Sequence, residues 1–411
     1  MKYIVICFLI FLMVIPSTGL AQKTDLTAAF VRNGDLWVIH DGKEKKVTHT
    51  KTVTSKPIWS HDGQYVAFLQ KGVLNEQGEL SDELWTYQIK GQKKKKIYSD
   101  AFNAKWSPKE NKIAFQHEGA LSVSDLKNFF NVSVGVGGYT WLPEGNGFLL
   151  SSNAMPTPQG WTNAVLYKKM LPEELVDTMD TEAEAFFTIP KQLKTDDAEI
   201  PAIGAEDFGF SPSKKWMSFI VYPTASWSMD SNMLSVIRTD GTDFSVVDEI
   251  ITGVGTPKWA PSEDILAYIG GSGRLVFGFK NKDLKTKEFP ASNSLTPESY
   301  AELDFTWLTD EQLVTSRVKE ADWSNDPANR PKPALYKINL ESQKQDQISS
   351  PSEQKGDYHP MFLEKEKKLA WLRGNDLIDE HKDVWIAEEY GSKAEKWVEN
   401  VSEISFYEPE H

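Results

Sequence analysis

The chain has 411 residues, of which 40% are hydrophobic and 25% are charged, and this ordinary globular composition excludes wholesale disorder. Its 45 lysines and arginines are outnumbered by 59 aspartates and glutamates, giving a formal net charge of −14. This balance argues against a nucleic-acid partner, because phosphate backbones are bound by clustered lysine and arginine. The single cysteine excludes an intramolecular disulfide and a multi-thiolate zinc site.

Residues 1–21 have the pattern of a secretory signal peptide. Lys2 precedes 13 apolar residues, Tyr3 to Ile15, and small residues at Gly19 and Ala21 predict cleavage after Ala21. An uncleaved anchor is the alternative, although spanning a bilayer takes about 20 apolar residues. The lone cysteine falls in this segment, so the mature chain would have none, which is common among exported bacterial proteins. We expect a periplasmic or extracellular bacterial protein whose mature chain has no membrane span.

A motif built on an aromatic residue recurs seven times in the rest of the chain. The clearest copies are Trp59–Phe68 and Trp106–Phe115, and further copies begin at Trp141, Phe210, Trp259, Trp307 and Phe362. The copies recur at a period of about 50 residues, which indicates a repeat architecture.

Each copy predicts four antiparallel strands. The aromatic residue ends a short first strand, and turn residues such as Ser-Pro-x-Gly follow it. In the first copy, alternating residues at 65–68 predict the second strand, residues 83–87 the third and residues 95–98 a more polar fourth. Four strands per period of roughly 40 to 50 residues indicate a β-propeller blade.

The two ends of the chain are complementary. Residues 26–48 supply a second, third and fourth strand without an aromatic first strand, whereas residues 403–407 form a lone strand after the last copy. Joining them completes a blade and closes the ring, which removes exposed sheet edges. We therefore predict one all-β propeller domain, residues 22–411, with eight blades; seven is the alternative, because the copy at Phe362 is weak.

The longest interval, from Trp141 to Phe210, contains an insertion. Pro172 followed by acidic residues predicts a short surface helix over 172–178. Residues 191–203 are polar and predict an extended loop between blades.

These repeats resemble those of the TolB-like propellers, whose WD40-like units share the pattern Trp-Ser-Pro-x-Gly-x-x-Ile/Val-Ala-Phe followed by Leu-Trp. Trp59–Phe68 with Leu84-Trp85, and Trp106–Phe115, carry the resemblance, which extends over residues 26–408. It implies a β-propeller of the bacterial cell envelope. Two differences from TolB are expected: no α/β domain precedes the repeats, and the blades number eight rather than six.

The sequence contains no recognisable catalytic or metal-binding motif. No Gly-x-Ser-x-Gly elbow occurs, and Gly271-Ser272-Gly273 is interpreted as a hairpin turn. The seven histidines include no HExxH pair. The acidic stretch 322–326 could supply oxygen ligands to Ca²⁺, the one cofactor considered. We expect a non-enzymatic protein without catalytic or metal-binding residues.

Three of the 14 tryptophans are not required by the repeat. Eleven fall in predicted strands, where aromatic rings fill the wedge between blades, but Trp161, Trp227 and Trp323 each lie between a second and a third strand. Loops at this position emerge on the same face of a propeller as the blade-to-blade connections. These three residues are therefore the candidate ligand-binding residues, the alternative being that each indole plugs its own loop.

Aromatic residues on loops around a ring are typical of recognition surfaces. The favoured hypothesis is a binding scaffold for an unidentified envelope or extracellular protein or peptide. The alternative is a carbohydrate-binding or carbohydrate-active propeller that uses the same face, with paired carboxylates beside the tryptophans.

Overall fold

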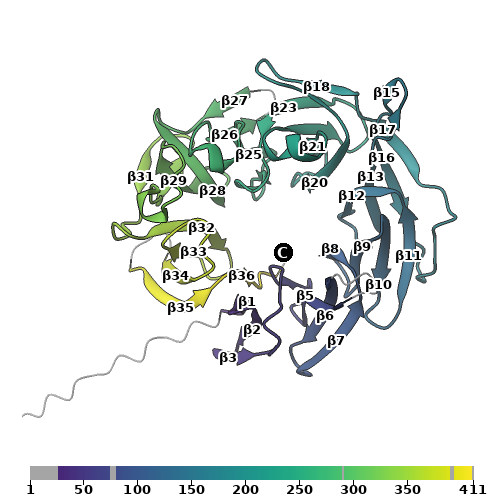
Figure 1. Ribbon diagram of the computed structural model, residues 1–411, viewed down its shortest axis with the longest axis horizontal. Coiled ribbons are helices and arrows are strands. Elements are labelled where there is room, and N and C mark those ends of the chain that lie inside the picture. The colour runs from purple at the N-terminus through teal and green to yellow at the C-terminus, as the bar shows by residue number, and fades with distance from the viewer. Residues whose placement is uncertain (1–25, 75–79, 289–290, 389–392, 410–411) are drawn as a thin grey trace, which may run out of the picture.

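The computed structural model describes residues 26–74, 80–288, 291–388 and 393–409, which form eight four-stranded antiparallel sheets arranged as blades around a ring (Figure 1). The eight-bladed propeller predicted from the repeats is confirmed. The predicted signal peptide lies outside the described residues.

The four strands of every blade follow one another from the ring axis outwards. Blade 1 contains, in that order, β36 (Glu403–Phe406), β1 (Ala28–Arg32), β2 (Asp35–His40) and β3 (Lys43–Lys46). Blade 2 contains β4 (Ile58–Trp59), β5 (Tyr65–Leu74), β6 (Leu80–Gln88) and β7 (Lys93–Tyr98). Blade 3 contains β8 (Phe102–Trp106), β9 (Ile113–His117), β10 (Ala120–Ser124) and β11 (Phe129–Val134). Blade 4 contains β12 (Val136–Trp141), β13 (Gly147–Ser152), β16 (Val165–Met170) and β17 (Glu184–Thr188).

The second half of the ring follows the same order. Blade 5 contains β20 (Gly204–Phe210), β21 (Trp216–Tyr222), β22 (Asn232–Arg238) and β23 (Ser245–Ile250). Blade 6 contains β24 (Lys258–Trp259), β25 (Ile265–Gly270), β26 (Asp283–Glu288) and β27 (Ala291–Ser294). Blade 7 contains β28 (Tyr300–Thr309), β29 (Gln312–Lys319), β30 (Ala334–Asn339) and β31 (Gln345–Gln347). Blade 8 contains β32 (Gly356–Leu363), β33 (Lys368–Gly374), β34 (Lys382–Glu388) and β35 (Glu395–Val401).

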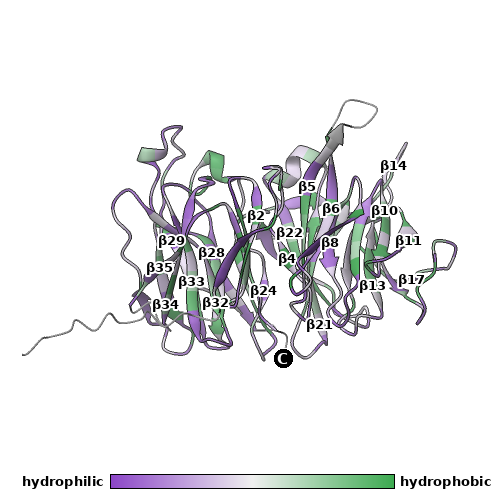
Figure 2. Cartoon of the chain, turned by 90° about the horizontal axis from the view of Figure 1, so that it is seen from below, coloured by the Kyte–Doolittle hydropathy of each residue, from purple (hydrophilic) through white to green (hydrophobic). Residues whose placement is uncertain are grey.

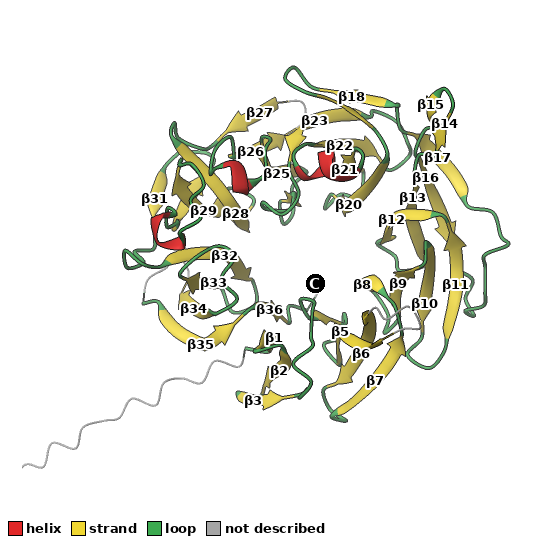
Figure 3. Cartoon of the chain, viewed as in Figure 1, coloured by secondary structure: helices red, strands yellow, loops and turns green. Residues whose placement is uncertain are grey.

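The remaining elements are short and lie outside the blades. Two hairpins pair β14 (Pro156–Thr157) with β15 (Gly160–Trp161), and β18 (Gln192–Lys194) with β19 (Glu199–Pro201). Three 3-10 helices, η1 (Ala225–Met229), η2 (Leu275–Phe277) and η3 (Pro327–Asn329), lie in the loops of blades 5, 6 and 7 (Figure 3). Within the described ranges, no helix has the length and hydrophobicity needed to cross a bilayer.

Three local predictions from the insertion and turns were wrong. Residues 172–178 contain no helix, because a segment this short gains too few hydrogen bonds to offset helix nucleation; Leu175 packs against the blades without one. Residues 191–203 are not a simple extended loop, since they form the β18–β19 hairpin, in which Leu193 and Ile200 are buried. Gly271–Gly273 is not a tight hairpin turn but part of a longer loop that contains η2.

The ring is closed by the two ends of the chain, as predicted. Strand β36 pairs antiparallel with β1, with Phe406 opposite Ala28 and Ile404 opposite Phe30. Tyr407 continues past this strand and packs its ring against Trp59 of blade 2, with the ring centroids 5.6 Å apart. Gly63, at a φ of +67°, makes room for this contact, because a Cβ there would lie 2.6 Å from the Tyr407 ring.

Neighbouring blades are joined by a repeated hydrogen bond between innermost strands. In five blades the motif tryptophan donates its indole N–H, at 3.0 to 3.2 Å, to the backbone carbonyl of the residue that precedes the motif aromatic of the blade before it. The donor–acceptor pairs are Trp59–Ser405, Trp106–Ile58, Trp141–Lys105, Trp259–Gly209 and Trp307–Lys258. The other three blades have Phe210, Phe362 and Phe406 at this position, which fill the wedge without a donor.

The hydrophobic core lies between neighbouring blades rather than at one centre. One cluster joins Ala29 and Val38 of blade 1 to Val66 and Phe68 of blade 2. Another joins Leu308 and Val314 of blade 7 to Leu369 and Trp371 of blade 8. All eleven tryptophans that were assigned to the repeat lie in the predicted strands.

Strand alternation gives the ring two distinct faces. The motif turns, which join first to second strands, form the turn face, and the loops between second and third strands form the loop face together with the blade-to-blade connections. In the side view of Figure 2 the short helices and β14 rise at the upper edge, and the C-terminus lies at the lower edge. The first residue of β1, Ala28, and the last residue of β36, Phe406, therefore both lie on the turn face.

Deletion of residues 403–411 tests the closure. Loss of β36 exposes the inner edge of β1 and removes two apolar side chains, Ile404 and Phe406, each worth about 1.5 to 3 kcal/mol when buried. We expect the free energy of unfolding to fall by at least about 3 kcal/mol, and oligomers to form through the open edge. Thermal unfolding and size-exclusion chromatography measure both effects. Deletion of residues 409–411 is the control, and equal melting temperatures for the two truncations would contradict this account of closure.

Candidate functional site

The three candidate tryptophans all lie in second-to-third-strand loops, in blades 4, 5 and 7. They differ sharply in how much of each indole reaches solvent. Trp161 and Trp227 are exposed, with 36% and 44% of their surface accessible, whereas Trp323 is partly buried. The loop face therefore presents two of these three indoles to solvent.

Trp161 ends the β14–β15 hairpin of blade 4. The hairpin is held by backbone pairing of Pro156 with Trp161 and by the Thr162 hydroxyl, which accepts from the amide of Met155 at 2.8 Å. Met155 is itself 63% exposed. The hairpin thus holds two large apolar side chains above the blade.

Trp227 belongs to a larger exposed apolar surface, the apolar ridge, which consists of Trp227, Met229, Val276 and Phe277. These residues lie on η1 and η2, and Phe277 is the most exposed of them at 66%. Arg274 joins the two loops: its Nε donates to Asp230 at 2.6 Å, and its guanidinium lies 5.1 Å from the Phe277 ring. Because this bidentate pair fixes one loop relative to the other, the ridge is preorganised.

Trp323 plugs its own loop. Its ring stacks on Phe279 at a centroid distance of 5.8 Å, and the Arg330 guanidinium lies 3.7 Å from its ring centre. Arg330 in turn forms a buried ion pair with Asp376 of blade 8. Trp323 therefore stabilises its own loop and, through Arg330, the junction of blades 7 and 8. For this tryptophan the alternative holds, in which the indole plugs its own loop instead of facing a ligand.

A cavity of about 540 Å³ opens on the loop face between blades 4 and 5. Its walls come from the two loops that carry Trp161 and Trp227, through residues 153–155 on one side and 222–228 on the other, although neither indole lines it. Tyr222 donates its hydroxyl to Asn153 Oδ1 at 2.8 Å across this junction. The bond passes over Gly204, where a Cβ would lie 2.3 Å from the Tyr222 hydroxyl.

The cavity is lined by one carboxylate, that of Glu206. Burial, together with the charge of the adjacent Asp207, raises the pKa of Glu206, and Lys105 opposes this shift. Burial and the charge of Glu206 raise the pKa of Tyr222 to about 12, so its hydroxyl stays protonated as a donor. The cavity therefore combines a neutral phenol with an acidic group.

The centre of the ring contains a second polar cluster, made by the innermost strands of blades 6, 7 and 8. Asp304 accepts from His359 Nδ1 at 2.9 Å and pairs with Lys258 Nζ at 3.4 Å. Burial alone would raise the pKa of Asp304, but the charge of Lys258 and the bond from His359 lower it to about 2. These residues line a cavity of about 720 Å³ that also reaches Lys56 and Glu403.

Apart from Lys258, the residues of this central cluster occupy an equivalent position in successive repeats, and the repeat motif does not include this position. The third residue before each motif aromatic is polar or glycine in every blade, and Asp304, His359, Glu403 and Lys56 hold it in four consecutive blades. A β-bulge at or beside this position interrupts β8, β12, β20, β28 and β32. Bulges re-aim side chains at strand ends, which explains how an innermost strand presents an acid or a histidine toward the ring axis.

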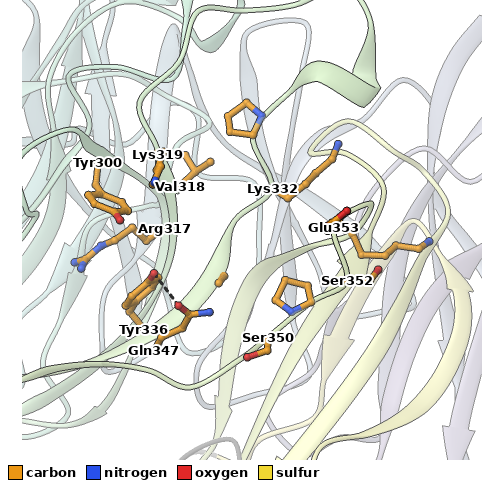
Figure 4. Close-up of a pocket in the computed structure, with 14 residues that line it drawn as sticks. Tyr300, Arg317, Val318, Lys319, Lys332, Tyr336, Gln347, Ser350, Ser352 and Glu353 are labelled. Atoms are coloured by element: carbon orange, nitrogen blue, oxygen red, sulfur yellow. Dashed lines mark hydrogen bonds between the residues drawn. The ribbon is translucent and has the colours of Figure 1, made fainter.

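A third cavity, of about 400 Å³, lies at the outer part of blade 7 near its connection to blade 8 (Figure 4). Tyr300, Tyr336 and Lys332 line it, and Tyr336 donates to Gln347 at 3.1 Å. Its cations serve the fold: Arg317 forms a buried pair with Glu302 at 2.6 Å, and Lys332 Nζ donates to the Asn375 carbonyl at 2.6 Å. The cations that line this cavity are therefore paired with other groups of the protein rather than left open to a ligand.

The acids that were considered for Ca²⁺ have other partners. Asp322 pairs with Lys280, and Asp326 accepts from the Ala328 amide at 3.0 Å as the N-cap of η3. In the parts of the chain that the structure describes, no group of three or more histidine, cysteine or acidic side chains is placed to hold a metal ion.

Comparison with known proteins identifies the fold alone. No protein-family model and no curated protein sequence matches the chain. Among solved structures, dihydro-heme d1 dehydrogenase NirN superposes with a TM-score of 0.56 at 12% identity, covering 97% of this chain and 78% of that one. This likeness agrees with the sheet topology in assigning a β-propeller.

Weaker likenesses cover other propeller proteins. A prolyl endopeptidase structure gives a TM-score of 0.47 at 12% identity, covering 93% of this chain and 51% of that one. TolB from Acinetobacter baumannii gives 0.38 at 12% identity, covering 95% of this chain and 68% of that one. The chain spans 51–53% of the length of three of the peptidase structures that it matches.

Alanine substitution separates the plugging tryptophan from the exposed ones. Trp323→Ala removes the stack between Phe279 and Arg330 and should lower the free energy of unfolding by about 2 kcal/mol. Trp161→Ala and Trp227→Ala should change it by less than about 0.5 kcal/mol, because surface substitutions have small effects. Urea denaturation measures all three variants, and equal destabilisation by Trp323→Ala and Trp227→Ala would refute the assignment.

The central cluster predicts a pH dependence of stability. Because the pKa of Asp304 is lower in the folded state than its ordinary value of 3.8, its charge stabilises the fold above pH ~4, and this is lost as the pH falls toward 2. The contribution is about 2 kcal/mol, of which roughly half is lost at pH 3. The stability gap between wild type and Asp304→Asn should therefore narrow by about 1 kcal/mol from pH 6 to pH 3 in urea unfolding. The gap for Glu341→Gln, at an exposed acid, should stay constant; the same constancy for Asp304→Asn would contradict the prediction.

Proposed function

We propose that the protein is an exported, TolB-like β-propeller that binds another protein or a peptide through its loop face, as a scaffold rather than as an enzyme. The observation that carries this proposal is the apolar ridge, in which four large apolar side chains with exposed fractions of 44% to 66% lie on two loops joined by the Arg274–Asp230 pair. Arg274 contacts Met229 Sδ at 3.6 Å and the Phe277 ring at 5.1 Å, so the apolar side chains of the two loops gather around it. Exposed apolar side chains gathered in this way mark protein interaction sites, and a preorganised surface loses less entropy on binding.

The two faces differ in a way that supports this choice. On the turn face, neighbouring turns are bonded to each other: Ser213 Oγ donates to Asp264 at 2.6 Å, and the Ser262 amide donates to Asp310 at 2.8 Å. On the loop face, large apolar side chains in blades 2, 4, 5, 6 and 8 are more than a third exposed, namely Leu80, Met155, Trp161, Trp227, Met229, Val276, Phe277 and Ile378. The turn face also has exposed apolar side chains, namely Phe129, Met170, Val176 and Met179, but these are confined to the outer strands of blades 3 and 4 and the loop between β16 and β17. The loop face has more of them, spread over five blades, for a partner to cover.

Export is part of the proposal and rests on the signal-peptide pattern of residues 1–21. Membership of the TolB-like group rests on the repeat pattern around Trp59 and Trp106. The carbohydrate alternative calls for two carboxylates roughly 5 to 10 Å apart beside the tryptophans. One carboxylate lines the cavity next to them, and the ridge itself is apolar, which favours a protein or peptide ligand.

Binding through the loop face predicts which substitutions matter. Immobilised wild-type protein is incubated with an envelope extract of the source bacterium, and the captured partner is then purified and titrated against variants. Trp227→Ala and Phe277→Ala should each weaken its affinity at least about tenfold, because central aromatic residues dominate interfaces. Met170→Ala, at a 53% exposed residue at the turn-face end of β16, is the matched control and should bind normally.

A partner whose affinity is unchanged by Trp161→Ala, Trp227→Ala and Phe277→Ala would refute binding through this face. Equal melting temperatures of all variants are required beforehand, so that a lost interaction is not a lost fold.

A further inference from the structure

The cavity between blades 4 and 5 contains a fully buried acceptor without a partner. Asn232 lines this cavity and is 0% exposed. Its Nδ2 donates to the Ser228 carbonyl at 2.7 Å, which fixes the amide, but its Oδ1 has no hydrogen-bond partner among the described residues. Buried acceptors are rarely left unpaired in folded proteins, so this oxygen calls for a donor.

The same cavity has an uncompensated negative charge. Across the described residues, the Glu206 carboxylate takes part in no hydrogen bond and no ion pair, and Asp207 beside it adds a second negative charge. Lys105 is the cation whose charge acts on Glu206, but its ammonium group contacts Tyr139 instead. Its Nζ donates to the Tyr139 carbonyl at 2.8 Å and lies 5.1 Å from the Tyr139 ring. The raised pKa of Glu206 reflects burial without a close positive charge, and a bound cation would lower it again.

The cavity and the apolar ridge share a helix. Ala225 and Ser228 of η1 line the cavity, while Trp227 and Met229 of the same helix belong to the ridge. Met155, on the opposite wall, is 63% exposed. A chain segment that covers the ridge therefore places its neighbouring residues over a cavity that contains two acceptors, the Glu206 carboxylate and Asn232 Oδ1, left unpaired within the described part of the chain.

We propose that this cavity is a specificity pocket that receives a lysine or arginine side chain from the partner segment bound on the ridge. The inference rests on the proposed function, and it names the partner as a peptide segment in which a basic residue is flanked by apolar ones. An ammonium or guanidinium group supplies only donors, which suits both Glu206 and Asn232, and charge-assisted bonds are the strongest available to it. The net charge of −14 also favours approach of a basic segment.

Selection from a random dodecapeptide phage library on the immobilised full chain tests the proposal without knowledge of the natural partner. Peptides that lose binding to Trp227→Ala and Phe277→Ala are synthesised. We expect them to carry lysine or arginine next to aromatic or aliphatic residues. Their affinity for Glu206→Gln should fall at least about tenfold, as for loss of a charged hydrogen-bond partner.

Two controls separate the pocket from general electrostatics. Glu298→Gln removes an exposed acid from the connection between blades 6 and 7, on the same face, and should leave affinity unchanged. Replacing the basic residue of the peptide by norleucine tests the pocket on unmodified protein. This change should lower the affinity of the peptide for wild type as much as Glu206→Gln does. It should lower the affinity for the Glu206→Gln variant only a little further.

The outcomes are distinguishable. Ridge-dependent peptides that lack a basic residue, or that bind Glu206→Gln as well as wild type, would overturn the pocket assignment and leave loop-face binding standing. Failure to select any peptide that depends on Trp227 or Phe277 would instead count against the proposed function itself.

Discussion

The hydrogen bond from a motif tryptophan to the carbonyl of the preceding blade is the contact on which the ring depends. The sheets of neighbouring blades are separate across the described residues, and the backbone bonds that join one blade to the next are isolated ones, such as that from Glu302 to the Lys282 carbonyl. Side chains must therefore fill the wedge between the blades. A tryptophan fills the wedge and donates this hydrogen bond at once, and five junctions use it. Where phenylalanine takes its place, as at Phe210 between blades 4 and 5, this indole bond is absent and other contacts, such as the bond from Tyr222 to Asn153, join the blades. The acidic cavity opens at this junction.

Much of this architecture could be predicted because it is encoded locally and repeatedly. The turn chemistry after Trp59 and Trp106 and the alternating strands that follow define a blade, and strand alternation alone places the loops of Trp161, Trp227 and Trp323 on one face. The exposure of each indole could not be predicted, because it depends on contacts that form only in the folded ring. Trp323 is covered by Phe279 and Arg330, and Phe279 comes from the blade before it.

The cavity between blades 4 and 5 was even less predictable from the sequence than the exposure of the indoles. Gly204, Asn232 and Glu206 have no distinguishing pattern in the sequence, and their roles arise from one shared location. Phe277 and Met155 were likewise missed, since a search guided by unexplained tryptophans passes over other apolar residues on the same loops. The propeller fold supports many activities, so such details, and not the blade pattern, have to be known before a ligand can be proposed.

The closing blade also constrains how the protein reaches its folded state. Its inner strand consists of residues 403–406, whereas its other three strands are the first to be synthesised, so β1 has no inner partner until nearly the whole chain exists. Pairings of such long sequence separation form slowly. The ring therefore cannot close before residues 403–406 have been added, and any chain that stops short of them keeps the inner edge of β1 open.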